Sequence, residues 1–202
     1  MRSGYPGTDT GGRISEVNRT LGAEGRRVPV EFQAVPAGRA VEIVRAWAQH
    51  RWPMTVDEGV EVHTGLGFGC AGSDPEMFTS DLSPDEDVSY FNSEHGSVFG
   101  VRVQLSNLVP EAGWAASLPR SREVFESYAT AFSQVFGAPY SKESTESSFK
   151  AQWFLDNGAG VGLNGNQALM ITASVESPED AEYHLSELED EKNGIPHDFD
   201  YF

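Results

Sequence analysis

The spacing of apolar residues predicts helices in four stretches of this chain. Over residues 38–51, apolar side chains recur every three or four positions with polar side chains between them, which is typical of an amphipathic helix. A longer helix is expected over about 120–136, with Ser121 as its N-cap and a broad apolar face that requires a sheet to pack on. Residues 177–191 begin with N-cap chemistry and predict a third helix. A weaker pattern suggests one short helix at 14–21.

Between these helices the pattern changes to alternation of apolar and polar residues, which is typical of strands with one buried face. The clearest alternation covers residues 60–68 and 98–106. Further strands are expected at residues 76–80, 87–92, 149–155, 160–164 and 168–175. The runs 156–158 and 164–166 carry Asn and Gly, which favour tight turns between the last three strands. We therefore predict an α+β fold, a single domain in which two or three helices pack on an antiparallel β-sheet.

The chain also divides by composition. Residues 1–30 are rich in Gly, Arg, Ser and Thr, and we interpret them as a flexible N-terminal tail. Residues 31–192 contain the other predicted helices and all the predicted strands, and we expect them to form the α+β domain. Residues 193–202 interleave acidic and aromatic side chains and are interpreted as a C-terminal tail.

Charge limits the classes of partner. The net charge is −17, and it is uneven: residues 1–53 carry a net +3 and residues 54–202 a net −20. Such a field repels phosphate backbones and anionic lipids, so we expect neither nucleic-acid binding nor membrane binding. It attracts a basic protein surface and speeds the encounter with it. The alternative is that the charge only keeps the protein soluble.

The expected compartment follows from cysteine content and from the N-terminus. Cys70 is the only cysteine, so an intrachain disulfide is excluded. No apolar run follows Met1, and no apolar stretch has the length of a membrane span. We expect a cytoplasmic protein.

Metal or cofactor chemistry is not indicated. None of the five histidines has another histidine three or four residues away, as common zinc sites require. The acidic runs do not match the spacing of a calcium-binding loop. We expect no metal site and no cofactor.

Nucleophilic catalysis would have to use Cys70, with His63 or His95 as its base. The glycine-rich residues 65–69 before it resemble a phosphate-binding loop, but a turn follows where such a loop requires a helix. No G-x-S-x-G motif is present. We therefore expect no catalytic residues and predict that the protein is not an enzyme.

An acidic turn with neighbouring aromatics is the candidate contact surface. Aromatic side chains carry affinity at the centres of protein interfaces, and charges contribute steering and rim contacts. The candidate partner-binding residues are Asp81, Asp85, Glu86, Asp87, Tyr90 and Phe91. The alternative is a polar hairpin tip with no binding role.

Several short motifs resemble a known family. A helix ending at residues 47–52 precedes the run 64–68, and the apolar run 124–136 precedes Trp153 and the strand 161–163. In this order, over about residues 36–175, the motifs are similar to a small actinobacterial family of uncharacterised proteins. The resemblance implies a role as an immunity factor of a polymorphic toxin system. It extends to the immunity factor for tuberculosis necrotizing toxin, which is an NAD glycohydrolase.

Three hypotheses result. The first is an immunity protein (antitoxin) that binds and occludes a cognate toxin domain, one with a basic surface or a site for an anionic substrate such as NAD. The second is a scaffold that binds a small molecule or peptide on the sheet face around His63 and Trp153. The third is a hydrolase built on Cys70.

Overall fold

The computed structural model describes residues 31–79, 81–82, 89–166 and 171–194. Its helices are α1 (Ala37–Ala48), α2 (Val56–Gly65), α3 (Trp114–Phe136) and α4 (Pro178–Lys192), with a 3-10 turn η1 (Glu111–Gly113) before α3. Its strands are β1 (Met54–Thr55), β2 (Met77–Phe78), β3 (Ser89–Glu94), β4 (Ser97–Gln104), β5 (Ser141–Ser144), β6 (Ser148–Phe154), β7 (Gly160–Asn166) and β8 (Ile171–Glu176).

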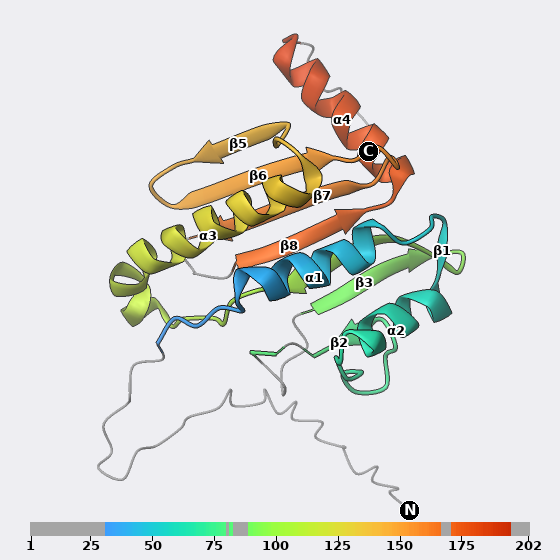
Figure 1. The fold of residues 1–202 in the computed structure, drawn as a ribbon, viewed down its shortest axis with the longest axis horizontal. Helices are drawn as coiled ribbons and strands as arrows, with labels where there is room; N and C mark the ends of the chain where they lie inside the picture. Colours follow the sequence, from blue (N-terminus) through green and yellow to red (C-terminus); the bar gives the residue numbers. More distant parts are fainter. Residues whose placement is uncertain (1–30, 80, 83–88, 167–170, 195–202) are drawn as a thin grey trace, which may run out of the picture.

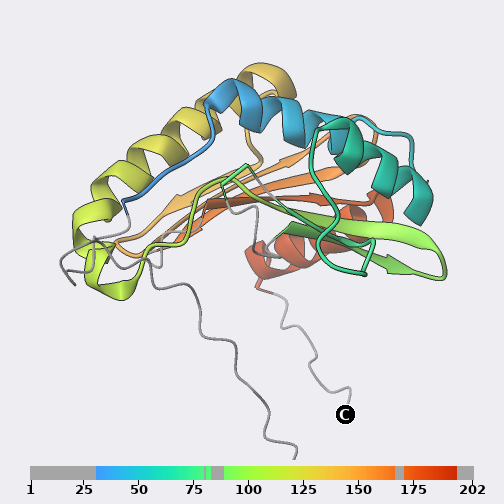
Figure 2. The same cartoon turned by 90° about the horizontal axis from the view of Figure 1, so that it is seen from below.

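The described strands form one antiparallel sheet in the order β2-β3-β4-β8-β7-β6-β5, and β1 pairs with β4. The helices α1, α2 and α3 cover one face of this sheet, whereas α4 lies on the opposite face at one end (Figures 1 and 2). The predicted α+β fold, a single domain with helices on an antiparallel sheet, is confirmed.

The core lies between the sheet and its three covering helices. Its largest fully buried side chains are mostly aromatic and come from both layers. For example, Phe125 of α3 packs against Phe149 with 4.9 Å between ring centroids, and Phe132 meets Trp153 edge to face at 5.7 Å. Burying one such side chain stabilises the fold by roughly 1.5–3 kcal/mol. This accounts for the apolar face that the sequence predicts for residues 120–136.

Tyr128 connects three parts of the chain within this core. Its hydroxyl donates to the carbonyl oxygens of Val35, at 2.5 Å, and Leu105, at 3.2 Å. Burial raises the pKa of the Tyr128 phenol. The phenol therefore stays protonated and ties α3 to the segment before α1 and to the end of β4.

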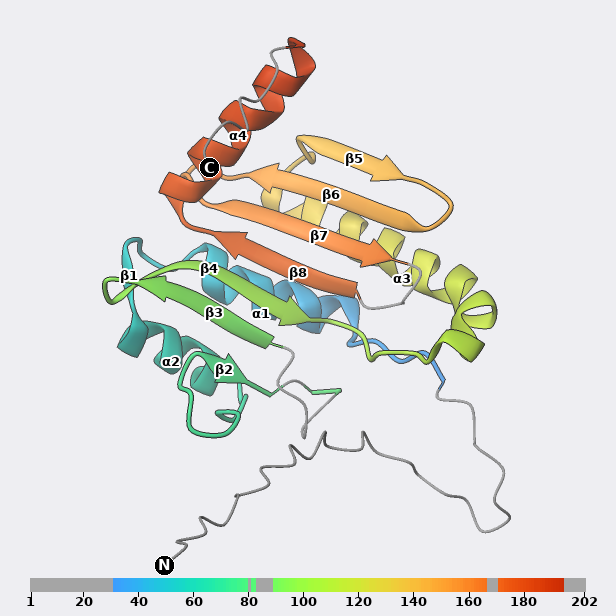
Figure 3. The same cartoon turned by 180° about the vertical axis from the view of Figure 1, so that it is seen from behind.

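The opposite face of the sheet is polar. The register places Arg102 of β4 opposite Ser174, and Ser174 opposite Gly162, which in turn faces Gln152. In Figure 3 this face is seen directly, and α4 crosses it only at one end. An antiparallel sheet with one face on the core and one solvated face has this alternation.

The strand predicted over residues 60–68 is wrong, because residues 56–65 form α2. A capping box starts this helix: the Thr55 hydroxyl accepts from the Glu58 amide at 3.3 Å, and the Glu58 carboxylate accepts from the Thr55 amide at 2.8 Å. The hydrogen bonds that the Thr55 amide and hydroxyl donate to this carboxylate lower the pKa of Glu58. The buried residues are Gly59 and His63, four positions apart, as in a helix.

Three smaller expectations need correction. The helix predicted from about 120 begins at Trp114, so Ser121 is a buried interior residue and not an N-cap. The strand β5 has no counterpart among the predicted strands. Gly165 lies within β7 rather than in a turn, because it pairs with Phe149 of β6 and Ile171 of β8. A Cβ there would come within 2.2 Å of the Phe149 ring, which accounts for a glycine at this position.

The other predicted elements that fall on described residues are confirmed, with ends that differ by a few residues. They include α1, β4, β6, β8 and α4. The helix expected at 14–21, most of the two tails and the turn at 83–87 lie outside the described residues. In the part of the chain that is described, no helix combines the length and the apolar character needed to cross a membrane.

Candidate functional site

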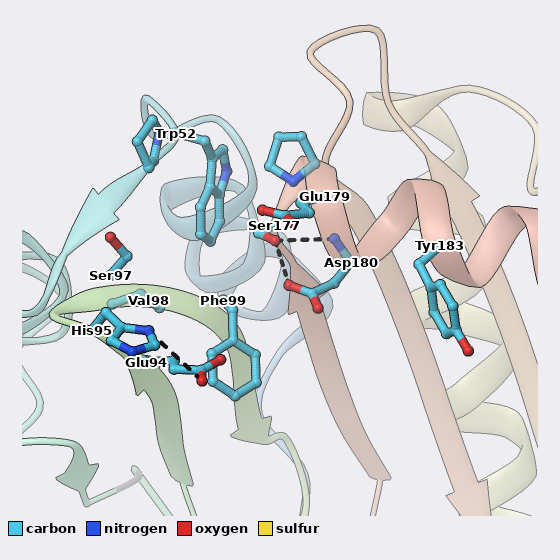
Figure 4. Close-up of a pocket in the computed structure, with 12 residues that line it drawn as sticks. Trp52, Glu94, His95, Ser97, Val98, Phe99, Ser177, Glu179, Asp180 and Tyr183 are labelled. Carbon is cyan, nitrogen blue, oxygen red and sulfur yellow. Dashed lines mark hydrogen bonds and ion pairs between the residues drawn. The ribbon is translucent and has the colours of Figure 1, made fainter. Parts of the chain in front are cut away.

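An open groove lies between the β3–β4 hairpin, the Trp52–Pro53 turn and the first turns of α4 (Figure 4). Its volume is about 840 Å³. We call it the hairpin–α4 groove. Its lining residues are Trp52, Pro53, Glu94, His95, Ser97, Val98, Phe99, Ser177, Pro178, Glu179, Asp180 and Tyr183.

The hairpin forms one wall. His95 and Gly96 both have positive φ, 51° and 83°, as a two-residue hairpin turn requires. The Val56 amide donates to the Gly96 carbonyl at 3.3 Å, which holds this turn beside the start of α2.

A β-bulge places Phe99 in the groove. Asn92 pairs with Gly100, but the next residue of β3, Ser93, pairs with Val98, so Phe99 is an extra residue in β4. Val98 stays in the core with 2% of its surface exposed, whereas 38% of Phe99 is exposed. A bulge turns a side chain that regular alternation would bury, and here it turns an aromatic ring outward.

The other wall is the start of α4, which is joined to the hairpin by a hydrogen bond. The Ser177 amide donates to the Phe99 carbonyl at 2.8 Å. Ser177 is also the N-cap of α4, and its hydroxyl accepts from the Asp180 amide at 3.2 Å. The N-cap that the sequence indicates is therefore also the residue that fixes α4 beside β4.

A glycine in β7 allows α4 to approach the sheet. A Cβ on Gly160 would lie 3.1 Å from the Cβ of Ala181, closer than most contacts of this kind. One turn later, the His184 Nδ1 lies 3.0 Å from Gln152 Nε2 and 3.2 Å from Glu176 Oε2. These contacts seat the first half of α4 on the polar face.

The rest of α4 makes little contact with the domain. In the described part of the chain α4 has 15 residues, and only Ala181 among them is buried. Tyr183 is 68% exposed at the side of the groove. Figure 1 shows the helix projecting past the edge of the sheet.

The groove is negatively charged. Three of its described lining residues carry a carboxylate: Glu94, Glu179 and Asp180. No lysine or arginine is among the described residues that line the groove. Along residues 176–194 the chain has eight acidic residues and one lysine. The Tyr183 hydroxyl bonds to the Glu187 carboxylate, which raises the pKa of the phenol. A site of this kind attracts cations.

Comparison with known protein families identifies the part of this chain that other proteins share. Residues 38–177 match the model of a family of unknown function, DUF6301. The chain belongs to this family. No curated protein and no solved structure matches the chain. The DUF6301 region ends at Ser177, so it contains the hairpin wall of the groove and stops where α4 begins.

Cysteine chemistry is not assembled in this DUF6301 protein. Cys70 is exposed, whereas His63 is fully buried on α2. The carbonyls of Phe68 and Pro75 lie near the His63 imidazole, but neither ring nitrogen makes a hydrogen bond of normal geometry. His95 lies on the exposed hairpin turn, with its Nδ1 3.7 Å from Glu94. Among the described residues, no hydrogen bond joins Cys70 to either histidine.

The other chemistry considered from the sequence is also not brought together. His63 and Trp153, expected on one sheet face, lie in different parts of the core. His63 stacks on Phe78, whereas Trp153 packs on Phe132. Over the described ranges, no group of three or more histidine, cysteine or acidic residues has the geometry to hold a metal ion.

The three described members of the predicted contact surface lie in different environments. Asp81 pairs with Arg39, with 3.1 Å between Oδ2 and Nε. Tyr90 is half-buried on the polar face opposite Arg102. Phe91 is 1% exposed, because it faces the core and packs near Trp47, so it is not available as a surface anchor. The remaining three, Asp85, Glu86 and Asp87, lie outside the described residues.

The sequence interpretation missed the residues of the hairpin–α4 groove. Only one signal for it was present, the His95-Gly96 pair between two strands, which is typical of a tight hairpin. The outward position of Phe99 depends on a bulge in the pairing of β3 with β4. No local pattern indicates such a bulge.

Proposed function

We propose that this protein binds another protein and acts as an immunity protein, occluding a cognate toxin domain without catalysis of its own. The observation that carries the proposal is α4, a projecting acidic helix with a single buried residue, Ala181, in the described part of the chain. The negative charge of the chain and its resemblance to immunity factors support the same function.

The exposure of α4 favours a binding role over a purely structural one. An isolated helix of about 12–15 residues is marginally stable in water, and most helices are stabilised by burying an apolar face. Here the half-buried leucines Leu185 and Leu188 and the exposed Tyr183 gain little from the domain. A partner that covers this helix would bury them.

Charge indicates the kind of partner. A toxin that acts on an anionic substrate such as NAD needs a basic active site, and an acidic helix is complementary to such a site. Stable complexes bury about 800 Å² on each partner. The exposed side of α4 and the hairpin–α4 groove together offer a continuous surface on which such an interface can form.

The direct test is a titration with a candidate toxin domain chosen from the genes that neighbour this one. We expect a 1:1 complex with a dissociation constant below micromolar and loss of toxin activity at one equivalent. A charge-reduced α4 variant, Glu187→Gln with Glu191→Gln, should bind more weakly. Failure to form a complex at micromolar concentrations of both proteins would refute the proposal.

The size of the groove favours a second candidate, a scaffold for a small ligand. Its volume of about 840 Å³ falls within the common range for ligand sites, roughly 300–1,000 Å³. The lining carboxylates restrict such a ligand to cations. A thermal-shift series with arginine, putrescine and choline tests this candidate: a saturable rise in the melting temperature with one of them, without toxin binding, would favour it.

A further inference from the structure

The hairpin–α4 groove combines two chemical features, aromatic rings and carboxylates. Its aromatic side chains, Trp52, Phe99 and Tyr183, come from three separate segments of the chain. Its carboxylates come from two of the same segments, Glu94 from the hairpin and Glu179 from α4. In Figure 4 the hairpin and helix side chains face the same open space.

The aromatic part is not explained by the fold. Phe99 is 38% exposed although Val98 and Val101 of the same strand lie in the core, and Tyr183 is 68% exposed. Regular pairing of β4 with β3 would not produce this exposure, because the bulge adds Phe99 as an unpaired extra residue. Large aromatic side chains at the surface of a groove are the usual anchors of protein interfaces.

The acidic part is only partly explained by the fold. Asp180 accepts from the Ser177 hydroxyl, and acids in the first turn of a helix favour its dipole. Glu94 has no such role: it lies at the end of β3, and 76% of its side chain is exposed. Within the described part of the chain, the one side chain that pairs with it is the adjacent imidazole of His95, with 3.7 Å between Oε1 and Nδ1.

An arginine side chain satisfies both features at once. Its planar guanidinium stacks on aromatic rings and also donates paired hydrogen bonds to a carboxylate. Lysine offers a point charge without this planar shape. The acids that continue along α4, among them Glu187 and Glu191, extend the negative surface beyond the groove and fit a chain of basic residues better than a single small cation.

We propose that the hairpin–α4 groove binds an arginine-bearing basic segment of the partner protein, with a guanidinium stacked on Phe99 and paired with Glu94 or Glu179. This assignment rests on the proposed function, since it names the surface and the partner chemistry through which the protein would bind. It also divides the surface: the hairpin wall belongs to the region matched by the DUF6301 family, and α4 follows that region.

The test titrates the full chain into a fluorescein-labelled peptide with four arginines spaced by Gly-Ser. Binding is measured as the fluorescence anisotropy of the peptide at 150 mM salt. The same peptide with lysine or glutamate in place of arginine provides the comparison. We expect saturable binding of the arginine peptide, weaker binding of the lysine peptide and none of the glutamate peptide.

Matched variants separate the groove from the overall charge of the chain. Glu94→Gln with Glu179→Gln should weaken arginine-peptide binding roughly 3- to 10-fold, as expected for two exposed charge pairs. Glu143→Gln with Glu146→Gln removes the same charge from exposed positions near β5 and should change it less than about twofold, since long-range charge is largely screened at this salt concentration.

An apolar pair of variants tests the stacking contact. Phe99→Ala should weaken binding about 2- to 5-fold, as expected for an exposed cation–π contact. Val135→Ala removes a side chain of similar exposure, 39%, outside the groove and should leave binding unchanged. Circular dichroism melts of every variant check folding, and Phe99→Leu serves as a second variant that keeps apolar volume without the ring.

The outcomes distinguish this inference from the proposed function. Equal weakening by the groove and control variants, or no weakening by either, would overturn the groove assignment. If the toxin domain binds and the groove variants leave its affinity unchanged, the assignment fails while the proposed function stands. If the groove variants selectively lose the arginine peptide but no toxin domain binds, the groove assignment stands and the proposed function fails.

Discussion

Replacing His63 should change how the stability of this protein depends on pH. The imidazole is fully buried in α2, where it stacks on Phe78 with 5.1 Å between ring centroids and 4° between ring planes. The Phe91 ring lies nearby, with 6.4 Å between its centroid and that of the imidazole. Burial among these rings lowers the pKa of His63 below its ordinary value of 6.5, because the charged form would lose its hydration.

The sign of the effect follows from proton uptake. In the unfolded chain His63 takes up a proton as the pH falls below 6.5, whereas the folded protein resists this until its lower pKa is reached. The contribution of neutral His63 to the free energy of unfolding is therefore fully present above pH 6.5. It is lost as the pH is lowered from there toward the pKa of the folded protein. The loss has an upper limit of about 1.4 kcal/mol for each pH unit.

Urea unfolding followed by tryptophan fluorescence measures this effect between pH 5 and 8. The variant His63→Leu fills the same space with an apolar side chain of similar size and removes the titrating group. Every other titratable group is present in both proteins. The free energy of unfolding of the wild type minus that of the variant should be constant above pH 7 and decrease below pH 6.5. A difference that stays constant across the whole range would refute the assignment of a neutral, buried imidazole.

Three further substitutions test the fold and the seat of α4. Tyr128→Phe should lower the free energy of unfolding by about 1–3 kcal/mol in urea titrations, because the buried Val35 carbonyl loses the phenol and the Leu105 carbonyl keeps only the Val35 amide as a donor; a loss below 0.5 kcal/mol would mean that water replaces the phenol. Ser177→Ala removes the N-cap of α4 and should cost about 1 kcal/mol, seen as faster amide hydrogen exchange in the first turn of that helix; unchanged exchange there would contradict the capping geometry. Gly160→Val should force α4 off the sheet at a cost of roughly 1–3 kcal/mol, with exchange rising in α4 while β4 stays protected. Protection of α4 equal to that of the wild type would show that the close approach of Gly160 to Ala181 is not limiting.

The sheet was largely predictable because its signals are local. The alternation in residues 149–155 and 168–175 identifies β6 and β8, and the turn residues 156–158 between β6 and β7 fix an antiparallel connection. The helices α1 and α4 have an apolar stripe or an N-cap at their start. These features depend only on residues close together in the chain.

The error at α2 shows where local pattern is ambiguous. Val60 and Val62 alternate with polar residues as in a strand, yet the same segment places Gly59 and His63 on one helical face. The capping box of Thr55 and Glu58 decides between the two, because it satisfies amide groups that only a helix leaves free.

The candidate site was not predictable, since it depends on contacts between distant segments. The exposure of Phe99 requires an extra residue in β4 relative to β3, and the position of α4 requires Gly160 in β7. Similarly, the phase of β3 buries Phe91 and leaves Tyr90 half-exposed, and the phase of so short a strand is set by pairing with β4.

Isothermal titration of the full chain with a candidate toxin domain from a neighbouring gene tests most directly whether this protein works by binding. We predict one binding site per chain, submicromolar affinity and a toxin that is inactive once the sites are filled. Absence of measurable heat and of any co-eluting complex at tens of micromolar, with the toxin still fully active, would contradict the function proposed for this protein.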